Sequence, residues 1–229
     1  MDFDVYPSEV VALVGDNGAG KSTLVKTIAG INIPDTGEIW FEGHQVAVHG
    51  PRDPAALGIS TVYQDLALCD NLDVVANLYL GREEVDPPVL LLSEERMEQR
   101  AREVLKSLDV KIPNPRNPIA ALSGGQRQSV AVARSVMWKA KVVLLDEPTA
   151  ALGVQQTKQV LELILRLRNQ GMGVVVISHN LANVFEVADR IVVLRLGKRV
   201  GTFERKAASE ERIVAAITGA EFGKFQPGA

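Results

Sequence analysis

A glycine-rich segment near the start of the chain has the residue types and spacing that phosphate binding requires. Residues 15–22 fit the pattern G-x-x-x-x-G-K-[ST]. The segment follows the apolar run 9–14 and precedes a helical stretch at 22–30, which favours a phosphate loop over a turn that merely caps a helix. In such a loop Lys21 would reach the β and γ phosphates of a nucleotide, and Ser22 would hold Mg²⁺. The residues that we assign to phosphate binding are Gly15, Asp16, Asn17, Gly18, Ala19, Gly20, Lys21, Ser22 and Thr23.

Two acidic residues follow a second apolar run. Asp146 and Glu147 come directly after residues 142–145, which are typical of a strand buried on both faces. Such a strand delivers its next residues to the carboxyl edge of a parallel sheet, where α/β proteins bind ligands. There Asp146 would hold Mg²⁺ through water, and Glu147 would reach an attacking water. The alternative is a polar loop after a core strand, but Pro148 blocks a regular helix start and the phosphate loop favours the metal role.

The elements that position these residues can be predicted from hydrophobic periodicity. The runs 9–14, 142–145 and 174–177, with helical patterns between them, predict a parallel sheet covered by helices. Shorter paired runs at 38–48 and 190–203 predict two hairpins, and together they indicate a small antiparallel piece. The fold class is therefore α/β.

Residues 71–139 lack strand signals and predict a helical subdomain. Ser93 opens an amphipathic helix within it, and prolines at 87–88 and 113–118 mark loops. We expect one domain over residues 1–229. Its parts would be a core at about 1–70 and 140–220, the helical subdomain at 71–139, and a frayed tail at 221–229.

Composition excludes several classes of protein. The 46% hydrophobic and 23% charged residues resemble ordinary globular chains, which excludes intrinsic disorder. A net charge of −3 gives no bulk attraction to nucleic acid, which we therefore do not expect as a partner. The single cysteine, Cys69, excludes an internal disulfide and fits a reducing cytoplasm. No apolar run approaches the roughly 20 residues that span a bilayer.

The segment Leu122-Ser123-Gly124-Gly125-Gln126 resembles the signature motif of the ATP-binding cassette family. Other family motifs occur in the family's order over residues 10–200. They are the phosphate loop, Gln64 after a predicted strand at 59–63, the signature, Asp146-Glu147, the turn 150–153, and His179 after the strand ending at Ile177. The resemblance implies a P-loop NTPase fold: a mostly parallel sheet flanked by helices, with a small antiparallel piece and a helical subdomain. It also implies binding of ATP and Mg²⁺.

The resemblance assigns further roles to residues. Gln64 would contact Mg²⁺ or water, and His179 would hold the γ-phosphate in the transition state, so the catalytic set is Glu147, His179, Gln64 and Lys21. The metal set is Ser22, Gln64 and Asp146. In this family the signature of one copy closes over the nucleotide of a second copy. A head-to-tail homodimer is therefore implied, with nucleotide contacts from Ser123, Gly124, Gly125 and Gln126.

The residues alone also allow simpler interpretations. Ser123 can cap the helix that starts at Gly124, with no ligand at all. The apolar loop 66–69 after Gln64 is unusual in water, so something must cover it. The family implies a groove for the coupling helix of a membrane-embedded permease, whereas the alternative is a loop folded onto the chain's own helical insert. His44 and His49 have no functional context, and we expect them at the surface.

Three segments, 147–153, 177–180 and 184–190, most resemble the ATPases of bacterial monosaccharide importers of the ribose, xylose and fructose type. This implies a cytoplasmic ATP hydrolase, peripheral on the inner face of the cell membrane, that energises a permease and serves a sugar-binding protein indirectly. The alternatives are a non-transport relative and a nucleotide-binding regulator with little turnover. About a hundred residues separate the phosphate loop from the signature, too few for the coiled coil of DNA-maintenance relatives.

The sequence departs from the family pattern at two places. Most members carry Asp where this chain has Gly153, although the sugar-importer branch often lacks it. Members also begin upstream of the position that matches Met1, with a strand and an aromatic residue that stacks on adenine. We therefore expect that a chain extended at this end binds ATP more tightly and separates ATP from GTP better. Tyr6 is the rival aromatic, and its alternative is an edge-strand tyrosine.

Overall fold

The computed structural model describes residues 1–87 and 91–220. Its centre is a six-stranded sheet with the order β10-β9-β1-β8-β7-β4. Neighbouring strands are parallel except for β9 and β10. The predicted mostly parallel α/β fold is confirmed. The strands are β1 Val10–Gly15, β4 Ile59–Val62, β7 Val142–Asp146, β8 Gly173–Ile177, β9 Arg190–Arg195 and β10 Lys198–Glu204.

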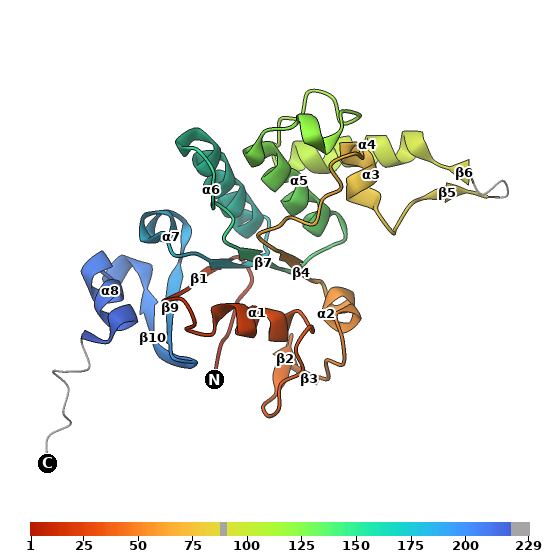
Figure 1. Ribbon diagram of the computed structural model, residues 1–229. Coiled ribbons are helices and arrows are strands. Elements are labelled where there is room, and N and C mark those ends of the chain that lie inside the picture. Colours follow the sequence, from red (N-terminus) through yellow and green to blue (C-terminus); the bar gives the residue numbers. More distant parts are fainter. Residues whose placement is uncertain (88–90, 221–229) are drawn as a thin grey trace, which may run out of the picture.

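Helices cover both faces of this sheet, with α1 on one side and α6 on the other (Figure 1). Val11 and Leu13 of β1 pack with Val25 of α1, whereas Val10 packs in the cluster that contains Leu163 of α6. Side chains alternate in direction along a strand, so a run that is apolar at every position must be buried on both faces. The helices around the sheet are α1 Lys21–Ile28, α2 Arg52–Leu57, α6 Val154–Asn169, α7 Leu181–Val187 and α8 Glu210–Thr218.

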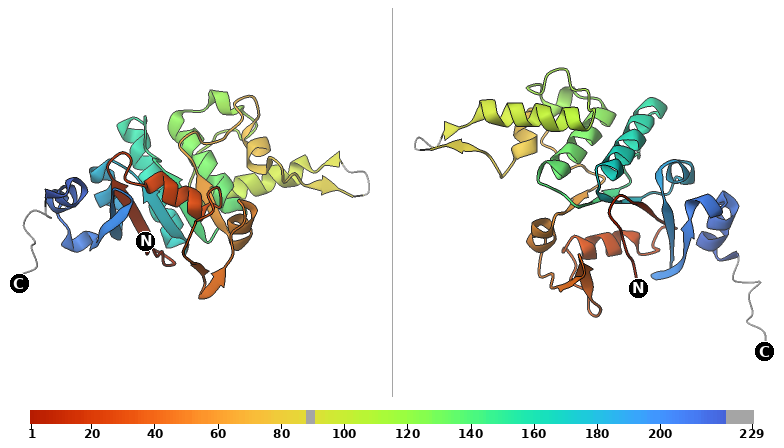
Figure 2. Two further views of the ribbon diagram at one scale, coloured as in Figure 1. Left: turned by 60° about the horizontal axis from the view of Figure 1, so that its bottom comes forward. Right: turned by 180° about the vertical axis from the view of Figure 1, so that it is seen from behind.

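The helical part extends away from the sheet, as Figure 2 shows. The predicted amphipathic helix is confirmed as α4, with Met97, Ala101 and Leu105 buried. The expectation that no strand occurs between 71 and 139 was wrong, because β5 and β6 form an antiparallel pair there. Strands of two residues are too short to show alternation in a sequence. The elements are α3 Val74–Tyr79, β5 Val85–Asp86, β6 Leu91–Leu92, α4 Glu94–Ser107, a 3₁₀ turn Ile119–Ala121 and α5 Gly124–Met137.

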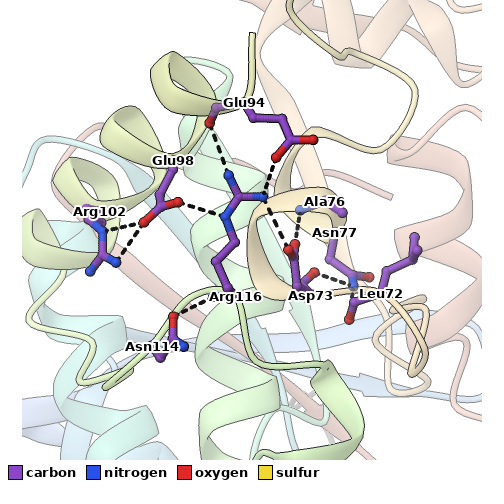
Figure 3. A network of polar contacts seen from close by, with 9 residues as sticks. All are labelled: Leu72, Asp73, Ala76, Asn77, Glu94, Glu98, Arg102, Asn114 and Arg116. Atoms are coloured by element: carbon purple, nitrogen blue, oxygen red, sulfur yellow. Dashed lines mark hydrogen bonds and ion pairs between the residues drawn. The ribbon is translucent and has the colours of Figure 1, made fainter. Parts of the chain in front are cut away.

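Arg116, in the proline-rich loop between α4 and α5, joins the parts of this helical region (Figure 3). Its Nε lies 2.7 Å from Glu98 of α4, and its Nη1 lies 3.4 Å from Asp73 and 3.3 Å from Glu94. Asp73 also caps α3 by accepting from the amide of Ala76. A network of several charges around one guanidinium is the arrangement in which surface ion pairs stabilise a fold.

The two predicted hairpins exist, but only one stands apart from the main sheet. Strands β2 (Ile39–Phe41) and β3 (His44–Val46) form a separate two-stranded sheet. Glu42 and Gly43 make its turn with φ of 49° and 79°, the left-handed pair that a tight hairpin needs. The second hairpin is β9–β10, and its β9 pairs in parallel with β1. It therefore extends the main sheet with one antiparallel strand, while β2–β3 forms the small antiparallel piece that was predicted.

Two features complete the outline. Among the described residues, none of the helices has the length and apolar character needed to cross a membrane. The frayed tail expected at 221–229 lies outside the described residues, as does Pro88 of the expected loop.

Candidate active site

Four adjacent parallel strands bring the predicted chemical groups to one edge of the sheet. In the order β1, β8, β7 and β4, their carboxyl ends are followed by the phosphate loop, His179, Glu147 and Gln64. Asp146 is the last residue of β7 and pairs in register with Ile177 of β8. The groups come from distant parts of the chain, and the shared strand direction gathers them.

The phosphate loop leaves the amino end of α1 uncapped. Gly20 occupies the N-cap with φ of 101°, and its lack of a side chain leaves no cap hydrogen bond there. The first turn of α1 carries no acidic residue, so its free amides and positive dipole end favour an anion. Lys21 folds back over the loop, with its Nζ donating to the carbonyl oxygens of Gly15 at 2.7 Å and Asp16 at 3.0 Å.

The turn between β9 and β10 supports the phosphate loop from behind. The amide of Gly197 donates to the carbonyl of Ala19 at 3.0 Å. A Cβ on Gly15 would lie 2.3 Å from the carbonyl oxygen of Leu194, so strand β9 permits only glycine there. Sequence reasoning missed this support, because Leu196-Gly197 reads only as a hairpin turn.

Asp146 is half-buried, and Lys21 of the phosphate loop is close enough to affect its charge. Burial raises the pKa of its carboxyl group, the neighbouring Glu147 raises it further, and the charges of Lys21 and Lys26 oppose the rise. In the protein alone, nearby positive charge therefore does not offset the cost of ionising this carboxyl group. Together with the exposed hydroxyl of Ser22 it forms a set of hard oxygen donors that could hold a small divalent cation.

Glu147 and His179 contact each other directly. Nδ1 of His179 donates to Oε1 of Glu147 over 2.9 Å. Glu147 has a left-handed φ of 49°, and its amide donates to the carbonyl of Ile177 at 2.9 Å. The carboxylate is 17% exposed and the imidazole 74% exposed, so the ring faces solvent while the acid lies beneath it. A strained acid held against an exposed histidine at a ligand-binding edge fits a catalytic site.

Gln64 is exposed and is the second residue after β4, and the apolar loop after it is partly covered by the chain itself. Leu66 and Leu68 pack against the cluster shared by α3, α4, α5 and one face of the main sheet, whereas Ala67 is exposed. This packing agrees with the interpretation in which the loop folds onto the chain itself. Ala67 stays open to solvent.

The signature lies at the amino end of α5. The predicted cap is confirmed, because Ser123 accepts from the amide of Gln126, and Gln126 returns a bond to the amide of Ser123. Gly124 is exposed, but Gly125 is buried, and a Cβ there would lie 3.0 Å from Cβ of Gln156 on α6. Close helix packing therefore accounts for Gly125, and Gly124 is the glycine open to a ligand. The side chain of Gln126 also donates to the carbonyl of Lys111, so these contacts tie the signature to the helical part and not to the phosphate loop.

Two sequence departures have different outcomes. Gly153 is the N-cap of α6, and nothing lies within 4 Å of a Cβ built there, so packing leaves room for the acid that most members carry. Tyr6 lies by the amino end of β8, since its carbonyl borders Gly173, and its ring lies 5.6 Å from the guanidinium of Arg190. Strand β1 separates Tyr6 from the phosphate loop, which favours the interpretation of Tyr6 as an edge-strand tyrosine. The sequence signal for this placement is that Tyr6 precedes the run 9–14, whereas the phosphate loop follows it.

The remaining histidines are away from this edge. His44 and His49 are exposed, as expected. His44 lies in β3, and Nδ1 of its ring contacts the carbonyl of Glu42 over 3.0 Å.

Comparison with known proteins identifies relatives along the whole chain. Residues 1–150 match the family model described as ABC transporter. A xylose/arabinose import ATP-binding protein of Sulfolobus acidocaldarius is 44% identical over 228 residues, which cover 100% of this chain and 90% of the relative. A fructose import ATP-binding protein of Rhizobium meliloti is 47% identical over 226 residues, which cover 96% of this chain and 87% of the relative.

Solved structures agree with these relatives. An ATP-binding cassette of an ABC transporter in its ADP conformation superposes with a TM-score of 0.79 at 25% identity, and the match covers 96% of this chain and 88% of that chain. A dimeric bacterial ABC transporter cassette gives a TM-score of 0.73 at 25% identity, with 89% and 88% covered. The resemblance drawn from the motifs and the fold that it implied are both confirmed. The chain belongs to the ABC transporter family.

Proposed function

We propose that this chain binds and hydrolyses ATP and thereby drives the import of a monosaccharide. The observation that carries the proposal is the single sheet edge at which an uncapped phosphate loop lies near Asp146 and the Glu147–His179 pair. Phosphoryl transfer needs positioned charge and an oriented water more than covalent chemistry, and these groups supply both.

The phosphate loop would hold the nucleotide. Backbone amides at the start of α1 would bind phosphate oxygens, and Lys21 would exchange its two carbonyl acceptors for the β and γ phosphates. The donor set of Ser22, Asp146 and Gln64 fits Mg²⁺, which prefers hard oxygen ligands and keeps several waters. Bound there, Mg²⁺ would neutralise charge on the phosphates. The charge of Mg²⁺ would also stabilise the ionised carboxylate of Asp146, which burial disfavours in the protein alone.

Glu147 would orient the attacking water, and His179 would hold the carboxylate of Glu147 in place. The hydrogen bond at Nδ1 orients the ring of His179 and leaves Nε2 on its exposed side, where a protonated Nε2 would donate to the γ-phosphate. The left-handed backbone of Glu147 turns its carboxylate across to β8, next to that ring.

The complete site requires a second copy. Within its own chain, the signature begins α5 and its Gln126 binds the carbonyl of Lys111. Ser123 and Gly124 are exposed and can contact another molecule. We propose a head-to-tail homodimer in which these residues close over the partner's nucleotide. A dimeric cassette among the solved relatives supports this arrangement.

The transported substrate is inferred from the relatives. The two import proteins named above act on xylose or arabinose and on fructose, and a 40% identical relative from Rubrobacter xylanophilus is a ribose import protein. We propose a cytoplasmic subunit, bound to a permease at the inner face of the membrane, that serves a sugar-binding protein. Uptake of labelled xylose, arabinose, fructose and ribose should be compared in a strain with and without the gene.

Phosphate release from purified protein tests the enzymatic proposal. We expect turnover that requires both ATP and Mg²⁺ and is abolished by Lys21→Ala. Tight ATP binding with no phosphate release, alone or with the permease, would favour the alternative of a nucleotide-binding regulator.

A further inference from the structure

The turn that follows Gln64 has an unfavourable backbone. Leu66 and Ala67 are consecutive residues with left-handed φ values of 59° and 46°. A side chain disfavours this conformation, which costs on the order of 1 kcal/mol or more for each residue that is not glycine. Two such residues in succession need an external contact that holds them.

Arg134 supplies that contact from α5, the helix that begins with the signature. Its Nη1 donates to the carbonyl of Ala67 at 2.7 Å, and its Nη2 donates to the carbonyl of Leu66 at 2.9 Å. One planar guanidinium thus binds the carbonyls of both left-handed residues. A lysine has a single charged nitrogen and cannot reproduce this fork.

The side chain of Arg134 makes its polar contacts with this turn. Its side chain is half-buried, and burial lowers the pKa of the guanidinium. Within residues 1–87 and 91–220, no ion pair joins Arg134 to a carboxylate; its hydrogen-bond acceptors are the two turn carbonyls. A half-buried charge without a carboxylate partner needs strong acceptors, and the two carbonyls supply them, so the turn and the arginine stabilise each other.

The far end of the segment is fixed independently. The buried side chain of Asn77 accepts from the amide of Cys69 at 2.7 Å and donates to its carbonyl at 3.0 Å. At the near end, the amide of Leu66 donates to the carbonyl of Tyr63 at 3.0 Å, which closes the turn around Gln64. The side chain of Gln64 is exposed, so its place at the sheet edge depends on this turn.

We propose that Arg134 is a positioning residue for Gln64: by binding the carbonyls of Leu66 and Ala67 it holds the strained turn that places Gln64 at the nucleotide edge. The inference rests on the proposed function, in which Gln64 faces Mg²⁺ and the nucleotide. It predicts that Arg134 affects turnover and not ATP binding. The phosphate loop joins β1 to α1, whereas the turn that Arg134 holds follows β4.

The first test compares Arg134→Met and Arg134→Lys with the unmodified chain. In the nucleotide-free protein, hydrogen exchange at the amide of Leu66 should be faster by about tenfold in Arg134→Met, since the turn opens locally. With ATP and Mg²⁺, kcat should fall by about tenfold while KM for ATP stays within about twofold. The Mg²⁺ concentration for half-maximal turnover should rise. Arg134→Lys should resemble Arg134→Met, and it carries the test if the methionine variant does not fold.

A second-site change separates positioning from general stability. Ala67→Gly removes the strain that Arg134 offsets. Adding it to Arg134→Met should therefore raise kcat several-fold above that of Arg134→Met alone. Lys139→Gly is the matched control. Lys139 also has a left-handed φ, of 59°, but it lies beyond the C-cap of α5 and borders Gly58 at the amino end of β4, away from the turn after Gln64, so its glycine should stabilise the protein without restoring kcat.

The outcomes are distinct. A lower melting temperature for Arg134→Met with unchanged kcat and unchanged exchange at Leu66 would overturn the proposal. Equal rescue by Ala67→Gly and Lys139→Gly would also overturn it, because the role would then be general stability. If the unmodified chain releases no phosphate, the proposed function fails, and the exchange comparison still decides whether Arg134 holds the turn.

Discussion

Oε1 of Glu147 lies 2.9 Å from Nδ1 of His179, although 31 residues separate the two in the chain. The contact arises because β7 and β8 are parallel neighbours, with Asp146 opposite Ile177, so that the residues just beyond each strand meet. The backbone bond from Glu147 to the carbonyl of Ile177 fixes the same approach. The acid and the histidine therefore act as one unit, and a change in either residue alters the orientation of the other.

Glu147→Gln should abolish turnover while preserving ATP binding. The amide can still accept from His179 but lacks the charge that orients and activates water, so hydrolysis should slow by on the order of 10² or more. Binding should persist because Lys21, Ser22 and the loop amides are unchanged. Phosphate release measures the first effect, and gel filtration with ATP and Mg²⁺ should show a dimer that accumulates.

Glu162→Gln serves as the control for that experiment. Glu162 is an exposed acid on α6, 3.7 Å from Arg166, and its loss should leave turnover near that of the unmodified chain. Unchanged turnover in Glu147→Gln itself would remove Glu147 from its proposed role.

Asp146→Asn should stabilise the nucleotide-free protein near neutral pH. Burial raises the pKa of Asp146 above its ordinary value of 3.8, so the folded state disfavours the charged form. The resulting penalty is fully present above the folded-state pKa and vanishes as the pH falls toward the unfolded value. The melting temperature of the variant should therefore exceed that of the unmodified chain at pH 7.5, and the difference should shrink toward pH 4.

Nucleotide should reverse that order. With ATP and Mg²⁺ present, the unmodified chain should gain more stability, because Asp146 then has its cation. Asp35→Asn, at an exposed position, is the control and should show no such pH dependence. A variant that is less stable than the unmodified chain at every pH would contradict the penalty for burying the charge of Asp146.

Tyr6→Ala should leave ATP affinity unchanged. The ring packs on Arg190 at the amino edge of the sheet, whereas nucleotide phosphates would bind at the carboxyl edge, six residues of strand away. Removing the ring should lower the free energy of unfolding by about 0.5–1 kcal/mol, the size of an exposed cation–π contact. Titration with ATP and chemical denaturation measure the two effects separately, and a tenfold loss of ATP affinity would contradict the placement of Tyr6.

Gly125→Ala should destabilise the fold more than Gly124→Ala. At position 125 the new methyl would meet Cβ of Gln156 at 3.0 Å, which forces α5 and α6 apart at a cost of about 1–3 kcal/mol. At position 124 the nearest atom, at 3.1 Å, is Cδ2 of Leu152, a side-chain end that can rotate away. Melting temperatures of the two variants test this order, and equal values would contradict the packing role of Gly125.

The phosphate loop and the acids after β7 were predictable from sequence, because each depends on local rules. A buried strand followed by glycines, or by two carboxylates, determines where its next residues lie. The contact between Glu147 and His179 was not predicted, since it requires knowing that β7 and β8 are neighbours. The sequence order of strands does not show this, as the insertion of β1 between β8 and β9 demonstrates.

The misplaced features have related physical causes. The turn residues Leu196-Gly197 predict that β9 and β10 pair. They do not indicate that β9 also pairs with β1 along its other edge. The buried packing of Gly125 depends on how closely α6 approaches α5, which no local pattern encodes. Arg134 reads as one more polar residue on a helix, and its role depends on two backbone carbonyls more than 60 residues earlier in the chain.

Two inactive variants should restore each other if the sites are shared between copies. Lys21→Ala removes the charge that faces the phosphates, so it should fail at nucleotide binding. Ser123→Arg should bind ATP normally but hydrolyse it poorly, because its altered surface acts on the partner's nucleotide. In a mixed dimer, the intact phosphate loop of the Ser123→Arg copy faces the intact signature of the Lys21→Ala copy, which makes one complete site.

Mixing the two proteins over a range of ratios tests this arrangement. Retention of labelled ATP after rapid gel filtration should peak near equal amounts, and phosphate release should recover in part. The retention measurement reports one closed site, so it does not require two sites to turn over together. Lys21→Ala mixed with Lys21→Ala,Ser123→Arg is the control, because neither copy then has an intact phosphate loop. Retention that never exceeds that of the separate variants would show that each chain closes its site without a partner.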